Sequence, residues 1–405
     1  MNSRVKTILF ALTIVLLSMP SIQQHTGLFH CKPLKGVTEA KFKPELNYQS
    51  LVDGSYQKDN EDYLMMHYGF REPLTRLYNQ AQWTLFRHSK VIDDQQVMIT
   101  RDNWMFETWT VEEYYQSRAY NYTDDSLKMA QMFEEEAQRL LKLQKALEPY
   151  NTHLFVALLP GKEQICSEHI PKNTLFNREK KLTAYGFYSK RLKELGINHV
   201  DFADWFMQMK DTVSYPLFPQ TGTHWSNLAA IHVADSLVRY MEDLADINMV
   251  NILFDKDFQR TIYPDDDLES LLNLVWPLHK QPNRLAYAYT DSDSTAVHPT
   301  LITIGDSFYW NILNLTPVWD VFSRVPFWYY FSTAYFDSPD GSDTKVADKD
   351  ILQEVKDADF VMIAYSTVGM YRLGSGFSEQ LIKKMGLDND FEKKEIQNEE
   401  VQDQI

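Results

Sequence analysis

Two side chains in this sequence have the types and settings needed for nucleophilic chemistry, a serine and a histidine. The serine, Ser307, follows the apolar run 300–305 in the sequence Gly305-Asp306-Ser307. A short apolar run predicts a buried strand, and the carboxyl ends of such strands carry the sites of open α/β sheets. There the backbone N–H of a serine can stabilise the oxyanion of acyl transfer. We interpret Ser307 as a nucleophile and Asp306 as part of its catalytic motif; the alternative is a plain turn, where Gly, Asp and Ser are common.

The histidine, His224, lies in the segment 221–226, just before a helix predicted over 226–244. A serine hydroxyl is a weak nucleophile until a base accepts its proton. Near a helix N-terminus the partial positive charge disfavours imidazolium, which helps to keep the ring neutral and able to act as that base. The alternative is a histidine that only caps the helix or bonds within the core. Its pairing with a later Gly-Asp-Ser favours the catalytic interpretation.

The elements that must position these residues alternate along the chain. Apolar runs at 154–159, 198–202, 300–305 and 360–365 predict strands, and helical periodicity appears at 126–147, 178–195 and 226–244. This alternation predicts an α/β fold, a three-layer α/β/α sandwich with a mainly parallel sheet. Residues 97–106 are typical of a hairpin, 326–336 of one further strand, and a short final helix follows Gly374-Ser375-Gly376.

The N-terminus has the pattern of an export segment. Arg4 and Lys6 precede an apolar run from Ile8 to Met19, which Pro20 closes. We expect residues 1–22 to be a signal peptide or an N-terminal membrane anchor, and the rest of the protein to be periplasmic or otherwise extracytoplasmic, possibly tethered to the inner membrane. We expect an extended arm and a helix (about 62–88) within 23–90, a catalytic domain over 91–387, and a disordered, charged tail over 388–405.

Composition excludes several classes of function. The formal net charge is -16, which argues against binding to nucleic acid. Only two cysteines, Cys31 and Cys166, are present, so one disulfide is arithmetically possible but the chain is no disulfide scaffold. Neither lies in a His-x-x-x-His or Cys-x-x-Cys pattern, and we expect no metal or other cofactor.

Several motifs together resemble one family. His224-Trp225-Ser226 precedes Gly305-Asp306-Ser307-Phe308, and further matching stretches are found at 102–106, 159–162, 168–171 and 217–219. In this order they are similar to the SGNH-hydrolase-like O-acetyltransferases of alginate and exopolysaccharides, over about Phe70 to Phe377. The histidine motif precedes the serine, reversing the order in ordinary GDSL esterases.

The resemblance implies roles and partners. Ser307 would be the acyl-accepting nucleophile and His224 its base, acting on a cell-surface polysaccharide with acetyl groups exported by a membrane-bound O-acyltransferase. One position departs from the pattern: the family's acid lies two residues before the histidine, where this chain has Gly222. Another carboxylate could substitute, or a backbone carbonyl could orient the histidine in a Ser–His dyad, or the protein is a degenerate glycan binder. The carboxylates considered are Asp201, Asp204 and the cluster Asp265-Asp266-Asp267.

Four more residues are candidates for substrate contact. Lys162, Tyr365 and Ser366 fall at predicted strand ends on the side of Ser307, and the aromatic face of Trp225 would suit a sugar. The leading hypothesis is an O-acetyltransferase. The alternatives are a secreted carbohydrate acetylesterase, with water as the acceptor, and a non-catalytic glycan-binding or assembly protein.

Overall fold

The computed structural model describes residues 3–36, 42–94, 96–115, 126–171, 182–259, 265–278, 284–338 and 340–387. The chain divides into two compact units. The first comprises Met1–Gln96 and Leu268–Leu278, and the second comprises Val97–Asp267 and His279–Ile405. The tail over 388–405, for which disorder was expected, lies outside the described residues.

The first unit is helical. Its helices are α1 (Ser3–Thr26), α2 (Tyr48–Val52), α3 (Ser55–His67), α4 (Arg71–Phe86) and α5 (Lys90–Asp93). The single helix expected near 62–88 is therefore two helices, because Tyr68 is extended and Phe70 adopts a left-handed φ of 63°. The segment Leu268–Leu278 belongs to this unit: the Asn79 amide donates to the Leu272 carbonyl over 2.9 Å.

The second unit is built on a sheet of seven strands in the order β10-β9-β8-β7-β11-β3-β4. The pairs from β8 through β7, β11 and β3 to β4 are parallel, and β8–β9–β10 are antiparallel. The predicted α/β fold with a mainly parallel sheet is confirmed. The strands are β3 (His153–Leu159), β4 (His199–Asp201), β7 (Leu301–Gly305), β8 (Phe327–Tyr329), β9 (Thr333–Tyr335), β10 (Thr344–Lys345) and β11 (Phe360–Ser366).

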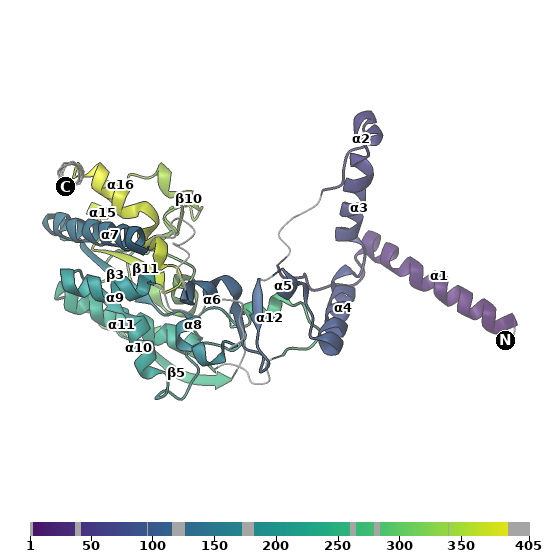
Figure 1. Ribbon diagram of the computed structural model, residues 1–405, viewed down its shortest axis with the longest axis horizontal. Coiled ribbons are helices and arrows are strands. Elements are labelled where there is room, and N and C mark those ends of the chain that lie inside the picture. Colours follow the sequence, from purple (N-terminus) through teal and green to yellow (C-terminus); the bar gives the residue numbers. More distant parts are fainter. Residues whose placement is uncertain are drawn as a thin grey trace. The chain divides into compact units, whose positions relative to one another are not determined.

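The central strands are buried on both faces, and their side chains alternate between two hydrophobic cores. In β11, Phe360, Met362 and Ala364 join one core, and Val361, Ile363 and Tyr365 join the other. Helices cover each face and make the three layers (Figure 1). The first core includes α10 (Phe202–Met209), α11 (Asn227–Ala245), α13 (Tyr309–Leu315) and α14 (Val318–Val321). The second includes α7 (Ser126–Leu147), α9 (Ala184–Leu195), α15 (Ile351–Lys356) and α16 (Phe377–Lys384).

Two sequence predictions, one of a hairpin and one of a single strand, have different outcomes. The hairpin over 97–106 is present as β1 (Val97–Ile99) and β2 (Met105–Glu107). The stretch 326–336, predicted as one strand, is instead the hairpin β8–β9, which turns at Tyr330 and Phe331 with φ of 48° and 53°. Such angles favour glycine or asparagine, so two aromatic residues gave no turn signal.

The remaining elements of this unit are α6 (Thr108–Tyr115), α8 (Lys162–Ile165), and the antiparallel pair β5 (Ile252–Gln259) and β6 (Arg284–Thr290). The helix α12 (Asp267–Leu271) begins with Asp267, and its other residues belong to the first unit. Short 3₁₀ turns lie at Glu148–Tyr150, Ser167–His169, Val346–Asp348 and Met370–Gly376. Cys31 and Cys166 are both free thiols.

Candidate active site

Ser307 lies just beyond the carboxyl end of β7, next to the paired strand β11. Asp306, which precedes it, is buried and joins β7 to β11: its Oδ2 accepts the Ser366 N–H over 2.8 Å and the Ser366 hydroxyl over 2.6 Å. Its Oδ1 accepts the Phe308 N–H over 3.1 Å. Burial raises the pKa of the Asp306 carboxyl, and the Ser366 hydrogen bonds oppose this. Asp306 therefore shapes the turn that presents Ser307.

His224 is held in a loop that is fixed just before α11. Ser226 caps that helix by accepting the Ala229 N–H, and its hydroxyl donates to the Pro216 carbonyl over 2.7 Å. The Ser226 N–H donates to the Leu217 carbonyl over 2.9 Å. The sequence prediction that the histidine immediately precedes a helix is confirmed in structure.

In the structure, His224 lies between Ser307 and Asp267 and contacts both. His224 Nε2 lies 3.0 Å from Ser307 Oγ. On the other side of the ring, Nδ1 lies 3.3 Å from Asp267 Oδ2, and the two side chains are 17% and 18% exposed. A neutral imidazole in this position can accept the serine proton through Nε2, while a carboxylate faces the opposite nitrogen.

The other carboxylates considered for orienting His224 have different contacts. Asp201 caps α10 by accepting the Asp204 N–H over 2.8 Å, and Asp204 accepts a hydrogen bond from Gln208 over 2.6 Å. Both therefore act at the start of α10. Of the cluster 265–267, Asp267 is the residue that reaches the histidine.

A small pocket opens beside Ser307. Its walls include Glu107 from the end of β2, Glu163 from α8, Tyr330 and Ser366. Burial, followed by the neighbouring charge of Glu163, raises the pKa of Glu107 to about 7. Burial also raises the pKa of Glu163, whose carboxylate accepts a hydrogen bond from Thr110. Sequence reasoning missed both glutamates; their one signal was that each directly follows a motif residue, Phe106 or Lys162.

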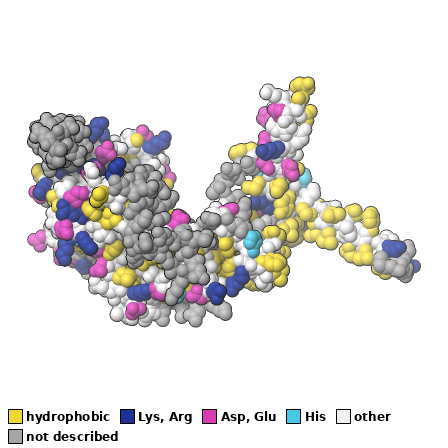
Figure 2. Space-filling view, in the orientation of Figure 1, with side chains coloured by type: hydrophobic (Ala, Val, Ile, Leu, Met, Phe, Trp, Pro, Cys, Tyr) yellow, Lys and Arg dark blue, Asp and Glu magenta, His cyan; other side chains and the backbone are white. Residues whose placement is uncertain are grey.

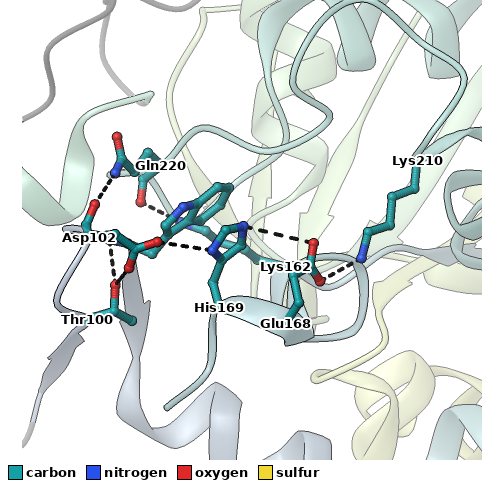
Figure 3. A network of polar contacts seen from close by, with 8 residues as sticks. Thr100, Asp102, Lys162, Glu168, His169, Lys210 and Gln220 are labelled. Carbon is teal, nitrogen blue, oxygen red and sulfur yellow. Dashed lines mark hydrogen bonds and ion pairs between the residues drawn. The ribbon is translucent and has the colours of Figure 1, made fainter.

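Lys162, the residue before Glu163, is buried and bonds to backbone carbonyls of two neighbouring segments. The side chain is 1% exposed, and its ammonium donates to the carbonyls of Met105, Gln220 and Gly222 over 2.7, 3.0 and 2.7 Å. Figure 3 shows the Gln220 side chain next to Asp102, whose carbonyl accepts the Gln220 amide over 2.5 Å. Burial lowers the pKa of Lys162 to about 8. Lys162, which was expected to contact substrate, is thus buried and bonded to the backbone of the β1–β2 hairpin and of the histidine loop.

The three other candidates for substrate contact lie at different depths. Trp225 is fully buried and packs on Phe308, with ring centroids 5.6 Å apart. Tyr365 is also fully buried and pairs with the Ser375 hydroxyl over 2.6 Å. Neither side chain is presented to a ligand in this structure, because each belongs to a hydrophobic core. Ser366 does line the pocket.

An α/β/α sandwich with a serine–histidine pair at the carboxyl edge of its sheet is an arrangement found in many serine hydrolases and acyltransferases. The sequence comparison is more specific. Residues 97–307, just over half of the chain, match the family model described as an SGNH hydrolase-like domain of acetyltransferase AlgX. The chain belongs to this family, and the matched residues include both His224 and Ser307. A comparison with curated proteins finds no match.

Solved structures similar to the chain carry related descriptions. The O-acetyltransferase domain of Pseudomonas putida AlgJ has a TM-score of 0.43 and 16% identity, covering 68% of this chain and 92% of its own. Pseudomonas aeruginosa AlgX has a TM-score of 0.42 and 10% identity, covering 72% and 68%. Bacillus cereus PatB1, in a structure with a sulfonyl adduct, has a TM-score of 0.41 and 11% identity, covering 68% and 99%.

Proposed function

We propose that this protein is an O-acetyltransferase that acts on a polysaccharide outside the cytoplasm, with Ser307 as the residue that carries the acetyl group. Family membership supports the reaction class. The single observation that supports the serine mechanism is the 3.0 Å separation between Ser307 Oγ and His224 Nε2, because this contact lets the ring accept the hydroxyl proton.

In the first half of the reaction, His224 Nε2 accepts the proton of Ser307 Oγ while Oγ attacks the carbonyl carbon of an acetyl donor. The backbone N–H of Ser307 is a donor for the resulting oxyanion. When the intermediate collapses, the bond to the donor oxygen breaks and His224 returns the proton to that oxygen. The products are acetyl-Ser307 and the free alcohol of the donor.

In the second half, a sugar hydroxyl takes the place of the departed alcohol. His224 accepts the proton of the sugar hydroxyl as the sugar oxygen attacks the acetyl carbon. When the bond between the acetyl carbon and Ser307 Oγ breaks, His224 returns the proton to Oγ. The product is an acetylated sugar. Water in the same position would give acetate, so the outcome depends on how well the acceptor fills the site.

A second hollow, adjacent to the catalytic pocket, is our candidate for the acceptor site. The two share Val368, and the second is lined by Tyr114 and Tyr185 together with Gln164, Ser167 and Thr183. Tyrosine rings suit the apolar faces of sugars, and amides and hydroxyls suit their hydroxyl groups. A sugar bound there would lie next to the acetylated serine.

The test of this function uses an acetylated aryl ester as donor, with and without an oligosaccharide acceptor. We expect aryl alcohol release and acetylated oligosaccharide from the wild type, and neither from Ser307→Ala. Release of aryl alcohol with acetate as the sole acetyl product, even at saturating acceptor, would identify an esterase. Unchanged acetylation by folded Ser307→Ala would contradict the assignment.

We also propose that α1 anchors the protein in the inner membrane, facing the periplasm. Residues Arg4–Thr26 form a helix with a mean hydropathy of 2.0 and exposed apolar side chains, visible along α1 in Figure 2. Arg4 and Lys6 before the apolar run favour a cytoplasmic N-terminus. An anchored transferase would suit a membrane-bound O-acyltransferase that supplies acetyl groups.

The packing of α1 within the first unit supports retention of this helix over its removal as a signal peptide. A Cβ atom on Gly69 would lie 2.1 Å from the Pro20 carbonyl oxygen and 2.7 Å from Gln23 Cβ, so only glycine permits this approach of α1. A C-terminally tagged chain should keep its full mass and resist carbonate extraction from membranes. A shortened, extractable chain would contradict the anchor.

A further inference from the structure

We propose that Asp267 is the positioning residue that orients His224, replacing from a different segment of the chain the acid that Gly222 cannot supply. The inference rests on the proposed function, since it concerns how that reaction obtains a correctly oriented base. It explains how the chain can keep a competent serine–histidine pair without a carboxylate two residues before the histidine.

The first argument is the geometry around the imidazole. Nδ1 of His224 is buried and makes no well-aligned hydrogen bond with the described residues, while Asp267 Oδ2 lies 3.3 Å away. A buried N–H needs an acceptor, and catalytic hydrogen bonds are often long before substrate binds. An acceptor at Nδ1 places the remaining proton there, which leaves Nε2 free to accept the proton of Ser307.

The second argument is that Asp267 is itself held in place. Its other oxygen, Oδ1, accepts the backbone N–H of Thr223 over 2.8 Å. Thr223 precedes His224 in the chain, so the carboxylate contacts the backbone of Thr223 through Oδ1 and the histidine ring through Oδ2. A carboxylate fixed at both oxygens can hold an imidazole at one angle, as an orienting acid must.

The third argument concerns Gly222. A Cβ atom at this position would lie 2.7 Å from the Asp265 carbonyl oxygen and 2.9 Å from Pro219 Cγ. The backbone of the segment that carries Asp267 therefore occupies the space that a side chain at position 222 would need. The absence of an acid at 222 and the presence of one at 267 are two results of the same packing.

The other carboxyl groups near His224, those of Glu107 and Asp306, make different contacts. Glu107 interacts electrostatically with both His224 and Asp267, but it lines the pocket beside Ser307. Asp306 also lies within electrostatic reach of His224, and both of its oxygens are engaged by Ser366 and Phe308. Of these groups, Asp267 is the one in direct contact with Nδ1.

The test compares Asp267→Asn, Asp267→Ala and Asp267→Glu, with Asp204→Asn as the matched control at α10. The asparagine amide would donate to Nδ1 and hold the ring in the wrong tautomer, so that Nε2 carries the proton and cannot accept another. We expect acylation of Ser307 by an aryl acetate to fall on the order of 10³-fold in Asp267→Asn. Asp267→Glu should recover part of the rate, and Asp204→Asn should leave it unchanged.

Two readouts separate positioning from a merely structural role. A structural role would make the isosteric Asn milder than Ala, whereas orientation makes Asn at least as damaging. The second readout is the tautomer of the His224 ring, because a merely structural role would leave the ring proton on Nδ1 in the variant. An Asp267→Asn rate within about threefold of wild type, a small change on the scale of orienting effects, would overturn the proposal.

The failure of this inference can be distinguished from failure of the proposed function. If Ser307→Ala is inactive while Asp267→Asn is fully active, the serine mechanism stands and the orienting role is refuted. If the wild type forms no acyl-serine, ¹⁵N NMR of His224 still tests the inference without turnover. We expect the proton on Nδ1 in the wild type and on Nε2 in Asp267→Asn; the same tautomer in both would overturn it.

Discussion

Replacing Lys162 with methionine would remove a single ammonium group that joins two segments of the backbone through three carbonyls. The ammonium donates to carbonyls of the β1–β2 hairpin (Met105) and of the histidine loop (Gln220 and Gly222). Methionine has a similar length and suits a buried site, so the change tests the polar contacts more than the packing. The expected result is a less stable protein with a displaced histidine loop.

The size of the effect follows from which carbonyls lose a donor. The Gln220 carbonyl also accepts the Met105 N–H over 3.0 Å, so the carbonyls of Met105 and Gly222 lose most. An unsatisfied buried carbonyl costs about 1–3 kcal/mol, which gives about 4 kcal/mol for two. Relief from burying a charge, the effect that lowers the pKa of Lys162 from 10.5 to about 8, offsets about 3 kcal/mol of this. We expect a net loss of about 1 kcal/mol, so the acylation rate is the more sensitive readout.

The assay is equilibrium unfolding in denaturant together with the rate of Ser307 acylation. Lys210→Met is the matched control, because Lys210 pairs with the half-exposed Glu168 at the surface, where an ion pair contributes about 0–1 kcal/mol. A shift of about 1 Å in the histidine loop would slow acylation on the order of 10²-fold. If Lys162→Met loses no more stability than Lys210→Met and keeps its acylation rate, the positioning role is refuted.

Three further predictions concern the pocket and its surroundings. The pKa of Glu107 is raised from 4.5 to about 7, so its contribution to stability is complete below pH 4.5 and is lost as the pH rises through 7. Glu107→Gln should therefore be more stable than the wild type by about 3 kcal/mol at pH 8 and equally stable at pH 4. Equal stability of the two proteins at both pH values would contradict the burial of this carboxyl group. Gly222→Ala places Cβ 2.7 Å from the Asp265 carbonyl oxygen and should cost about 1–3 kcal/mol in thermal unfolding, with slower acylation; an unchanged melting temperature would refute the packing. Tyr114→Ala should raise the KM for oligosaccharide about tenfold, as expected for loss of one aromatic contact of about 1.4 kcal/mol, while leaving donor acylation unchanged; an unchanged KM would remove the second hollow as acceptor site.

The sheet could be predicted because its strands are buried on both faces. The stretches 153–159, 301–305 and 360–366 are almost unbroken apolar runs, a pattern typical of strands that are buried on both faces. The β8–β9 turn could not be predicted, since Tyr330 and Phe331 adopt left-handed angles without the residues that signal them. There the tertiary packing of aromatic side chains outweighs local preference.

The serine–histidine pair was predictable because each residue lies beside a recognisable element boundary. The orienting carboxylate was not, because Asp265, Asp266 and Asp267 are alike in sequence and only the packing against Gly222 selects the third. Lys162 and Trp225 were expected to contact substrate from their types and places. Their burial depends on how the hairpin and the histidine loop fold over them, which sequence periodicity does not report.

The most direct test of the central claim is intact mass spectrometry after treatment with a serine-directed fluorophosphonate. We compare the wild type, Ser307→Ala and His224→Ala, each shown to be folded by circular dichroism. The account predicts one adduct per chain on the wild type, none on Ser307→Ala and greatly slowed labelling of His224→Ala. No adduct on the folded wild type, or equal labelling of Ser307→Ala, would contradict an activated Ser307.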